Sequence, residues 1–218
     1  MRQLFKCYMA FTGNLYRILC LLICPAIIIL VYGVIRWKIG ENMAYGFSIT
    51  CSFLLVEVIG NYLLSGGIAS KQTEKLFYLK SSAKGEEILR NAMVADILRR
   101  FFYFVLELLL AVVISEILPE NGRGSAFGKD GGISVFLGLL FAGYFYGTIG
   151  IMATRLFDSF RVAISVLGFL FFLASINCRF LYLNTPSYSI AVVYLLLSIV
   201  ASICSIYIVT RRFLGVPR

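Results

Sequence analysis

The chain has 218 residues, of which 60% are hydrophobic, 14% are charged and none is His. Because roughly a quarter of the residues of an ordinary soluble protein are charged, this composition excludes that class. The absence of His excludes His-ligated zinc, His-based catalytic triads and His-ligated haem, and the six Cys form no Cys-x-x-Cys ligand set.

Residues 1–14 form a basic leader in which Leu4, Tyr8 and Phe11 recur at helical spacing. This pattern predicts an amphipathic helix that lies along the membrane surface. No small-x-small cleavage site follows the first apolar stretch, so we expect that stretch to be retained as a membrane helix.

Six apolar stretches of about 20 residues or more follow the leader, and each predicts a membrane-spanning helix. They cover residues 15–35, 43–68, 101–118, 132–154, 162–182 and 188–210. Only helices and closed barrels cross lipid, and these stretches are too long for barrel strands. We therefore predict an all-α integral membrane protein whose single transmembrane domain is residues 1–218, with two helices in 15–68, four in 101–210 and a tail at 211–218.

The Lys and Arg residues collect in the loops on the side of the two termini. The other side carries Arg36, Lys38, Arg123, Lys129 and Arg179. Because positively charged loops stay in the cytoplasm, this bias predicts that both termini are cytoplasmic, and it explains the net charge of +9 without a nucleic-acid partner. Trp37, between Arg36 and Lys38, indicates an interfacial anchor.

The cytoplasmic loop at residues 69–100 is long and charged, so we expect it to have a function. Its first part is an apolar, aromatic segment framed by cations: Lys75, Leu76, Phe77, Tyr78, Leu79 and Lys80. Large apolar patches are seldom left in water, so this segment contacts either a partner or lipid headgroups. The second part begins with Glu86 and Glu87, which favour a helix start, and we expect it to lie at the interface and to bend after Arg100 into the third span.

Six spans, the amphipathic leader and the segment YLKSSAKGEEILR at residues 78–90 together resemble the permease subunit of type-2 ABC exporters. The architectural resemblance covers the whole chain, and the local motif covers about 20 residues; the Pro usual in that motif is replaced by Ser or Ala. Small members of the group export toxic or antimicrobial peptides of the phenol-soluble modulin type.

The resemblance implies that residues 71–80 form a coupling helix, with Lys75 to Lys80 resting in a groove of a separate ATPase subunit. ATP and Mg²⁺ would bind that ATPase, and this chain, which lacks a P-loop, would hold no cofactor. The implied partners are a second copy or a related permease, membrane lipids and a peptide substrate. The implied location is a bacterial cytoplasmic membrane.

Among the polar residues inside the predicted spans, Glu57, Asn61 and Glu107 are the candidates for a functional role. Burying charge in lipid is costly, so they either line a translocation pathway or form structural hydrogen bonds between packed helices. Gly143 and Gly147 form a small-xxx-small face that suits either packing within the chain or a dimer seam.

Three other functions fit the composition. A six-helix substrate-binding subunit of a vitamin importer would also need an external ATPase, but the long cytoplasmic loop argues against it. A membrane-embedded lipid-modifying enzyme is disfavoured by the lack of His and of paired titratable groups. An accessory or immunity protein of the same ancestry would have the architecture without transport.

Overall fold

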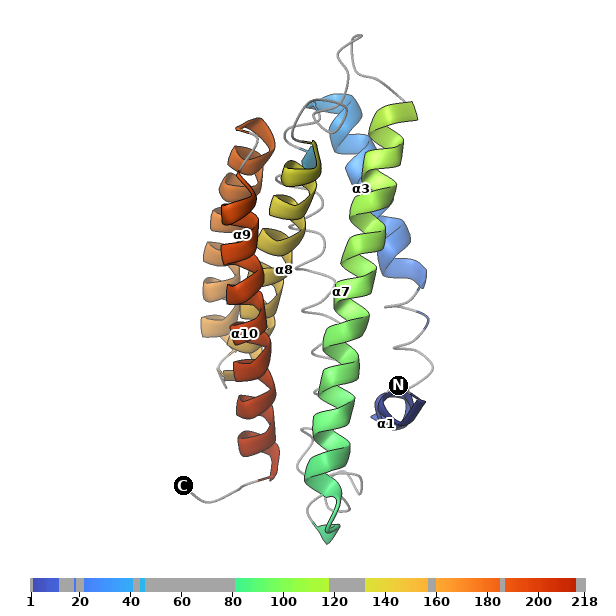
Figure 1. Ribbon diagram of the computed structural model, residues 1–218, viewed down its shortest axis with the longest axis vertical. Helices are drawn as coiled ribbons and strands as arrows, with labels where there is room; N and C mark the ends of the chain where they lie inside the picture. Colours follow the sequence, from blue (N-terminus) through green and yellow to red (C-terminus); the bar gives the residue numbers. More distant parts are fainter. Residues whose placement is uncertain are drawn as a thin grey trace.

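The computed structural model describes residues 2–11, 18, 22–40, 44–45, 81–117, 132–156, 160–184 and 187–214. Every described element is a helix. In chain order and with the labels of Figure 1, these are α1 (Arg2–Phe11), α3 (Cys24–Lys38), α7 (Gly85–Ile117), α8 (Gly132–Leu156), α9 (Phe160–Leu183) and α10 (Tyr188–Leu214).

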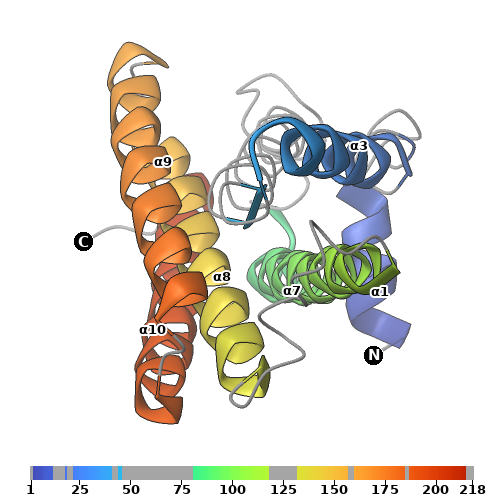
Figure 2. The ribbon, with the colours of Figure 1, turned by 90° about the horizontal axis from the view of Figure 1, so that it is seen from above.

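The long helices run side by side, with α8 next to α7, α9 and α10 (Figures 1 and 2). α8 contacts α9, α10 and α7, while α7 also contacts α10, α3 and α1. α1 lies across the direction of the long helices, beside the half of α7 that contains its N-terminal end (Figure 1). The chain is therefore a helical bundle with one crosswise helix at its side.

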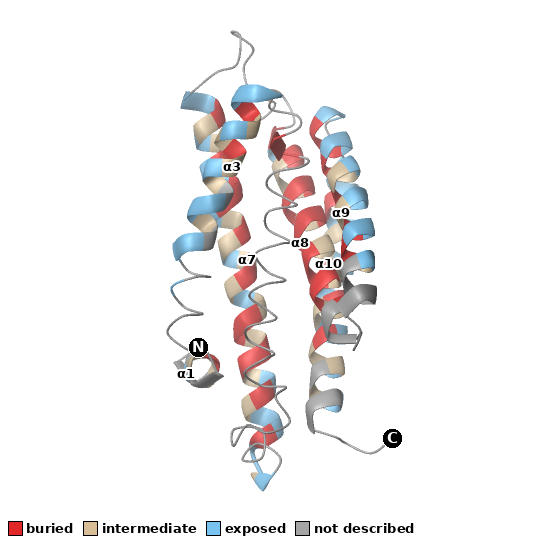
Figure 3. Cartoon of the chain, turned by 180° about the vertical axis from the view of Figure 1, so that it is seen from behind, coloured by how far each residue is buried: buried red, intermediate tan, exposed pale blue. Residues whose placement is uncertain are grey.

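Three described helices are long and apolar enough to cross a membrane, over Gly132–Ala153, Ser165–Leu183 and Tyr188–Ile208. Within these stretches 61% of the α8 residues are buried, compared with 28% in α9 and 22% in α10. α8 is therefore the central helix. Much of α9 is instead exposed (Figure 3), and the exposed residues of α9 and α10 include large apolar ones such as Phe172, Phe180 and Val200.

An apolar outer surface is the arrangement expected of a protein surrounded by lipid, because large exposed apolar areas are rare on soluble proteins. The chain is thus a helical membrane protein. The predicted helices at 132–154, 162–182 and 188–210 agree with α8, α9 and α10 to within a few residues.

The other three predicted spans are described only in part. The span at 43–68 lies, apart from residues 44–45, outside the described residues, and so does the segment at 71–80. α3 covers the second half of the predicted first span. Pro25 stands in the first turn of α3, where the backbone N–H that Pro lacks would have no partner within the helix. Residues 101–117 form the C-terminal half of α7.

The expected bend after Arg100 is absent, because α7 is one continuous helix of 33 residues. Two sequence features explain the difference. No Gly or Pro interrupts the helix after Gly85, and Asp96 forms ion pairs with Arg99 and Arg100 across the junction between the charged and apolar halves. α7 therefore runs about 50 Å without a break, at 1.5 Å per residue.

α1 occupies most of the predicted leader helix at 1–14. Tyr8 is buried while Lys6 is exposed, so the helix has the two-sided character that the spacing predicts. α1 also contacts α7, so part of the leader packs on protein, which the spacing did not predict.

Candidate functional site

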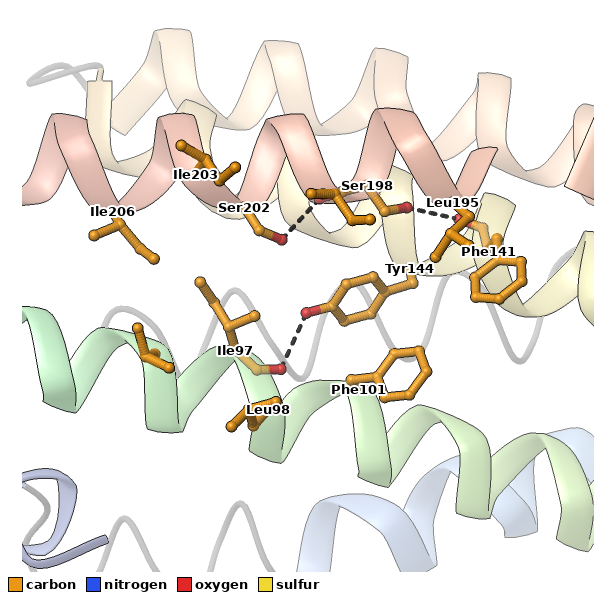
Figure 4. Close-up of a pocket in the computed structure, with 12 residues that line it drawn as sticks. Ile97, Leu98, Phe101, Phe141, Tyr144, Leu195, Ser198, Ser202, Ile203 and Ile206 are labelled. Atoms are coloured by element: carbon orange, nitrogen blue, oxygen red, sulfur yellow. Dashed lines mark hydrogen bonds between the residues drawn. The ribbon is translucent and has the colours of Figure 1, made fainter. Parts of the chain in front are cut away.

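An apolar groove lies between α7 and α10, and α8 forms its floor (Figure 4). Its volume is about 300 Å³. α7 contributes Val94, Ile97, Leu98 and Phe101, and α10 contributes residues between positions 195 and 206. α10 packs extensively against α8, whereas α7 makes far fewer contacts with either of them, and the groove lies along this looser junction.

The hydroxyl groups that line the groove are already bonded to backbone carbonyls. Tyr144 donates to the carbonyl oxygen of Ile97 at 3.0 Å, which ties α8 to α7. Ser198 donates to the carbonyl oxygen of Phe141 at 3.2 Å, and Ser202 donates to that of Ser198 at 2.8 Å (Figure 4). Because these hydroxyl protons point at the backbone, the groove presents carbon surface and suits an apolar chain.

A buried ion cluster lies on α7 where its charged half meets its apolar half. The Arg100 Nη2 atom is 2.9 Å from Asp96 Oδ2, and the Arg99 Nη2 atom is 3.3 Å from Asp96 Oδ1. Arg99 also lies over the ring of Tyr103. Asp96 and Arg100 are almost fully buried, so the pairing offsets a desolvation cost that neither charge would bear alone.

A second polar cluster joins α3 to the C-terminal end of α7. Arg36 donates through Nη1 to the carbonyl oxygen of Ile114 at 2.9 Å and through Nη2 to that of Ser115 at 3.1 Å. Tyr32, one turn earlier in α3, donates to the carbonyl oxygen of Ala111 at 3.3 Å. A cation at this position also complements the negative end of the α7 helix dipole.

The predicted interfacial anchor at residues 36–38 is therefore wrong for Arg36, which is buried. The position of Arg36 in α3 turns its side chain toward α7, where backbone carbonyl oxygens accept hydrogen bonds from the guanidinium. Trp37 is 80% exposed and Lys38 lies 4.3 Å from the centre of its ring, as an anchor would.

A third polar cluster connects α9 with α8 and α10 inside the apolar spans. The amide nitrogen of Asn177 donates to the hydroxyl oxygen of Tyr146 at 3.0 Å and to that of Tyr194. α9 and α10 follow each other in the chain but contact each other little, so the hydrogen bond from Asn177 to Tyr194 is one of the few links between them. Amide groups at membrane depth commonly hold helices together in this way.

Among the predicted pathway residues, Glu107 lies in α7 and is 2% exposed. Its burial agrees with the expectation that a carboxylate at this depth avoids lipid, and its role in a pathway stays a prediction. Glu107 does not line the groove between α7 and α10. The remaining predicted residues lie outside the described residues: Glu57, Asn61, Lys75, Leu76, Phe77, Tyr78, Leu79 and Lys80.

Gly143 stands where α8 lies directly against a side chain of α7. A Cβ atom at this position would overlap Cζ of Phe104, whose ring is buried. This contact favours packing within the chain over a dimer seam for Gly143. Gly147, one turn further along α8, is also buried.

The groove and two of the polar clusters were absent from the sequence interpretation. The spacing of Asp96, Arg99 and Arg100 at i, i+3 and i+4 is a readable signal of helical ion pairs. Asn177 is a polar residue within an apolar stretch, which is also a usable signal. The groove had no such signal, because apolar side chains face lipid as often as they face protein.

Within the described ranges, no three Cys, Asp or Glu side chains come together in a group that could hold a metal ion. Comparison with known proteins adds no family: no protein-family model, no curated protein and no solved structure matches the chain. The function is therefore argued from the residues and their arrangement.

Proposed function

We propose that the chain is the membrane permease subunit of an ATP-driven ABC exporter that moves amphipathic or antimicrobial peptides out of the cell. It acts as a dimer, with a second copy or a related permease, and is driven by a separate ATPase. The observation that carries this proposal is the continuity of α7. One unbroken helix starts at Gly85, next to the segment expected to contact the ATPase, and ends among the packed helices of the bundle.

A continuous helix transmits displacement because its backbone hydrogen bonds and buried ion pairs resist bending. A force applied near Gly85 would reach α8 and α10 through the side chains of Ile97 and Phe101 on α7. The chain itself would hydrolyse nothing in this scheme. Its part is to open and close a path between the two copies.

The distribution of charge supports a cytoplasmic location for the ATPase end. α1, the start of α7 and the C-terminal end of α10 lie toward the same end of the bundle (Figure 1). Exposed cations at these elements include Lys6, Lys84, Arg90 and Arg211. The positive-inside rule then assigns this end to the cytoplasm.

The proposal is tested by purifying the full chain with a tag after expression with its neighbouring reading frames. We expect a stoichiometric P-loop ATPase of about 30 kDa to co-purify, since such an ATPase carries the motif that this chain lacks. Changing Phe77 and Tyr78 to Ala should release the ATPase, because these side chains are expected to fill its groove. A chain that purifies without any ATPase would refute the proposal.

The matched control changes Trp37 and Ile39 to Ala, which removes two exposed apolar side chains at the opposite end of the bundle. This variant should keep the ATPase bound. Equal loss of ATPase from both variants would mean that the effect is a general loss of folding, and it would count against the coupling segment.

A further inference from the structure

The face of α7 that lines the groove changes from charged to apolar along its length. Val94, Ile97 and Phe101 line the groove, and Arg90 and Glu87 continue the same face toward the start of the helix at spacings of three and four residues. Arg90 and Glu87 are exposed. Along this face of α7, the apolar side chains of the groove are therefore followed by the cation Arg90 and then by the acid Glu87.

The boundary between lipid and water falls at the charged end of the groove. α10 presents exposed apolar side chains as far as Tyr207, and the first charged side chain after Tyr207 is Arg211. α7 and α10 run in opposite directions (Figure 1), so Val94, the first lining residue of α7, and Ile206, the last lining residue of α10, belong to the same end of the groove. Arg90 therefore lies at the depth of lipid headgroups, and the groove lies in the hydrocarbon.

The position of α1 agrees with this depth. α1 is amphipathic, with Tyr8 buried and Lys6 exposed, and it lies beside the same half of α7 on the side away from α10 (Figures 1 and 2). Amphipathic helices of this kind lie in the plane of the membrane interface. Among the described helices, α1 therefore does not cover the side of α7 that faces α10.

Arg90 is available to an anion from outside the protein. Arg99 and Arg100 are both held by Asp96, but no described acidic side chain forms an ion pair with Arg90. Glu86 and Glu87 are exposed one turn nearer the start of α7, which is further from the hydrocarbon by about 5 Å at 1.5 Å per residue. The charges therefore occur in a fixed order along the membrane normal.

This order matches the chemistry of a zwitterionic phospholipid, in which an acyl chain leads to a phosphate and the phosphate leads to an ammonium group. We propose that the groove between α7 and α10 binds an acyl chain of an ethanolamine phospholipid, with its phosphate at Arg90 and its ammonium at Glu86 and Glu87. The guanidinium donates paired hydrogen bonds to phosphate oxygens, and the carboxylates accept those of the primary ammonium. A lipid that lacks the ammonium group would place a negative or neutral group beside Glu86 and Glu87, and the two carboxylates would then have no cation to bind.

The proposal is independent of the transport function, because lipid binding needs no ATPase. The test uses the full chain purified in detergent and measures bound lipid by native mass spectrometry with dioleoyl phosphatidylethanolamine, phosphatidylglycerol and phosphatidylcholine. We expect one phosphatidylethanolamine per chain to be retained, with an affinity about tenfold above that for phosphatidylglycerol. Phosphatidylcholine should bind less well, since its quaternary ammonium donates no hydrogen bond.

Substitutions separate the headgroup contacts from the groove. R90Q should reduce retention of phosphatidylethanolamine about tenfold, whereas R211Q should not, because Arg211 stacks on Tyr207 and neither residue lines the groove. The double change E86Q and E87Q should remove the preference for phosphatidylethanolamine over phosphatidylglycerol while leaving binding itself intact.

Two neighbouring residues of α10 test the groove. Ile199 lines it and Val200 is exposed outside it, so I199W should block lipid retention and V200W should leave it unchanged. Equal retention of all three lipids, or an unchanged retention of phosphatidylethanolamine in R90Q, would overturn the proposal. Preferential binding of phosphatidylglycerol would also overturn it, because the acids would then have no ammonium to bind.

Discussion

At the scale of single residues, close contacts between helices decide where this bundle tolerates change. α8 approaches α7 so closely that the place of a Gly143 side chain is already taken by the ring of Phe104. At Gly33 and Gly168, in contrast, an added Cβ atom would meet no other atom within 4 Å, so both stand on open helix faces. Glycines with the same chemistry therefore have different structural roles.

Changing Gly143 to Ala should lower the free energy of unfolding by about 1 to 3 kcal/mol, because the added methyl group overpacks the contact with Phe104. Changing Gly168 to Ala should leave stability unchanged or raise it by up to about 1 kcal/mol, since Ala is the better helix former. The measurement is thermal unfolding of the purified protein in detergent. Combining G143A with F104L should recover part of the loss; equal melting temperatures for G143A and G168A would contradict the contact.

At the scale of elements, polar side chains join helices whose apolar faces alone would pack in several ways. In lipid there is little hydrophobic drive for one helix to contact another, so hydrogen bonds and close fit carry more of the specificity. Arg36 ties α3 to the last turn of α7, and Asn177 ties α9 to α8 and α10. Tyr144 ties α8 to the middle of α7.

Changing Arg36 to Met should destabilise the protein by about 2 to 3 kcal/mol, because two charge-assisted hydrogen bonds to the α7 carbonyls are lost. Changing Lys38 to Met should have an effect within about 0.5 kcal/mol, since Lys38 is exposed and only stacks on Trp37. Both variants keep an unbranched apolar stem of similar length. The prediction fails if thermal unfolding in detergent shows the same shift for the two.

At the scale of the whole molecule, the bundle has one end rich in exposed cations and one end marked by the exposed Trp37. The ends of α1, α7 and α10 that carry Lys6, Lys84 and Arg211 lie together, and α3 ends at Lys38 on the other side (Figure 1). A single orientation in the membrane should therefore place all three cations on one side.

Single Cys residues introduced at Lys84 and Arg211, in a chain whose own six Cys are replaced, should react with an impermeant maleimide only after the cells are opened. A Cys introduced at Trp37 or Asn184 should react in intact cells, because these exposed positions lie at the opposite end of the bundle. Labelling of positions 37 and 84 from the same side would contradict this orientation.

The order of the amino acids is enough to identify a helical membrane protein and to place α8, α9 and α10 to within a few residues, because apolar length alone identifies a span. It does not say which faces of those helices meet. In lipid both the buried and the exposed face of a helix are apolar, so hydrophobic periodicity no longer separates inside from outside. The inward turn of Arg36, the contact of Gly143 with Phe104 and the groove between α7 and α10 depend on that choice of faces, and each follows from the packing of one helix against another.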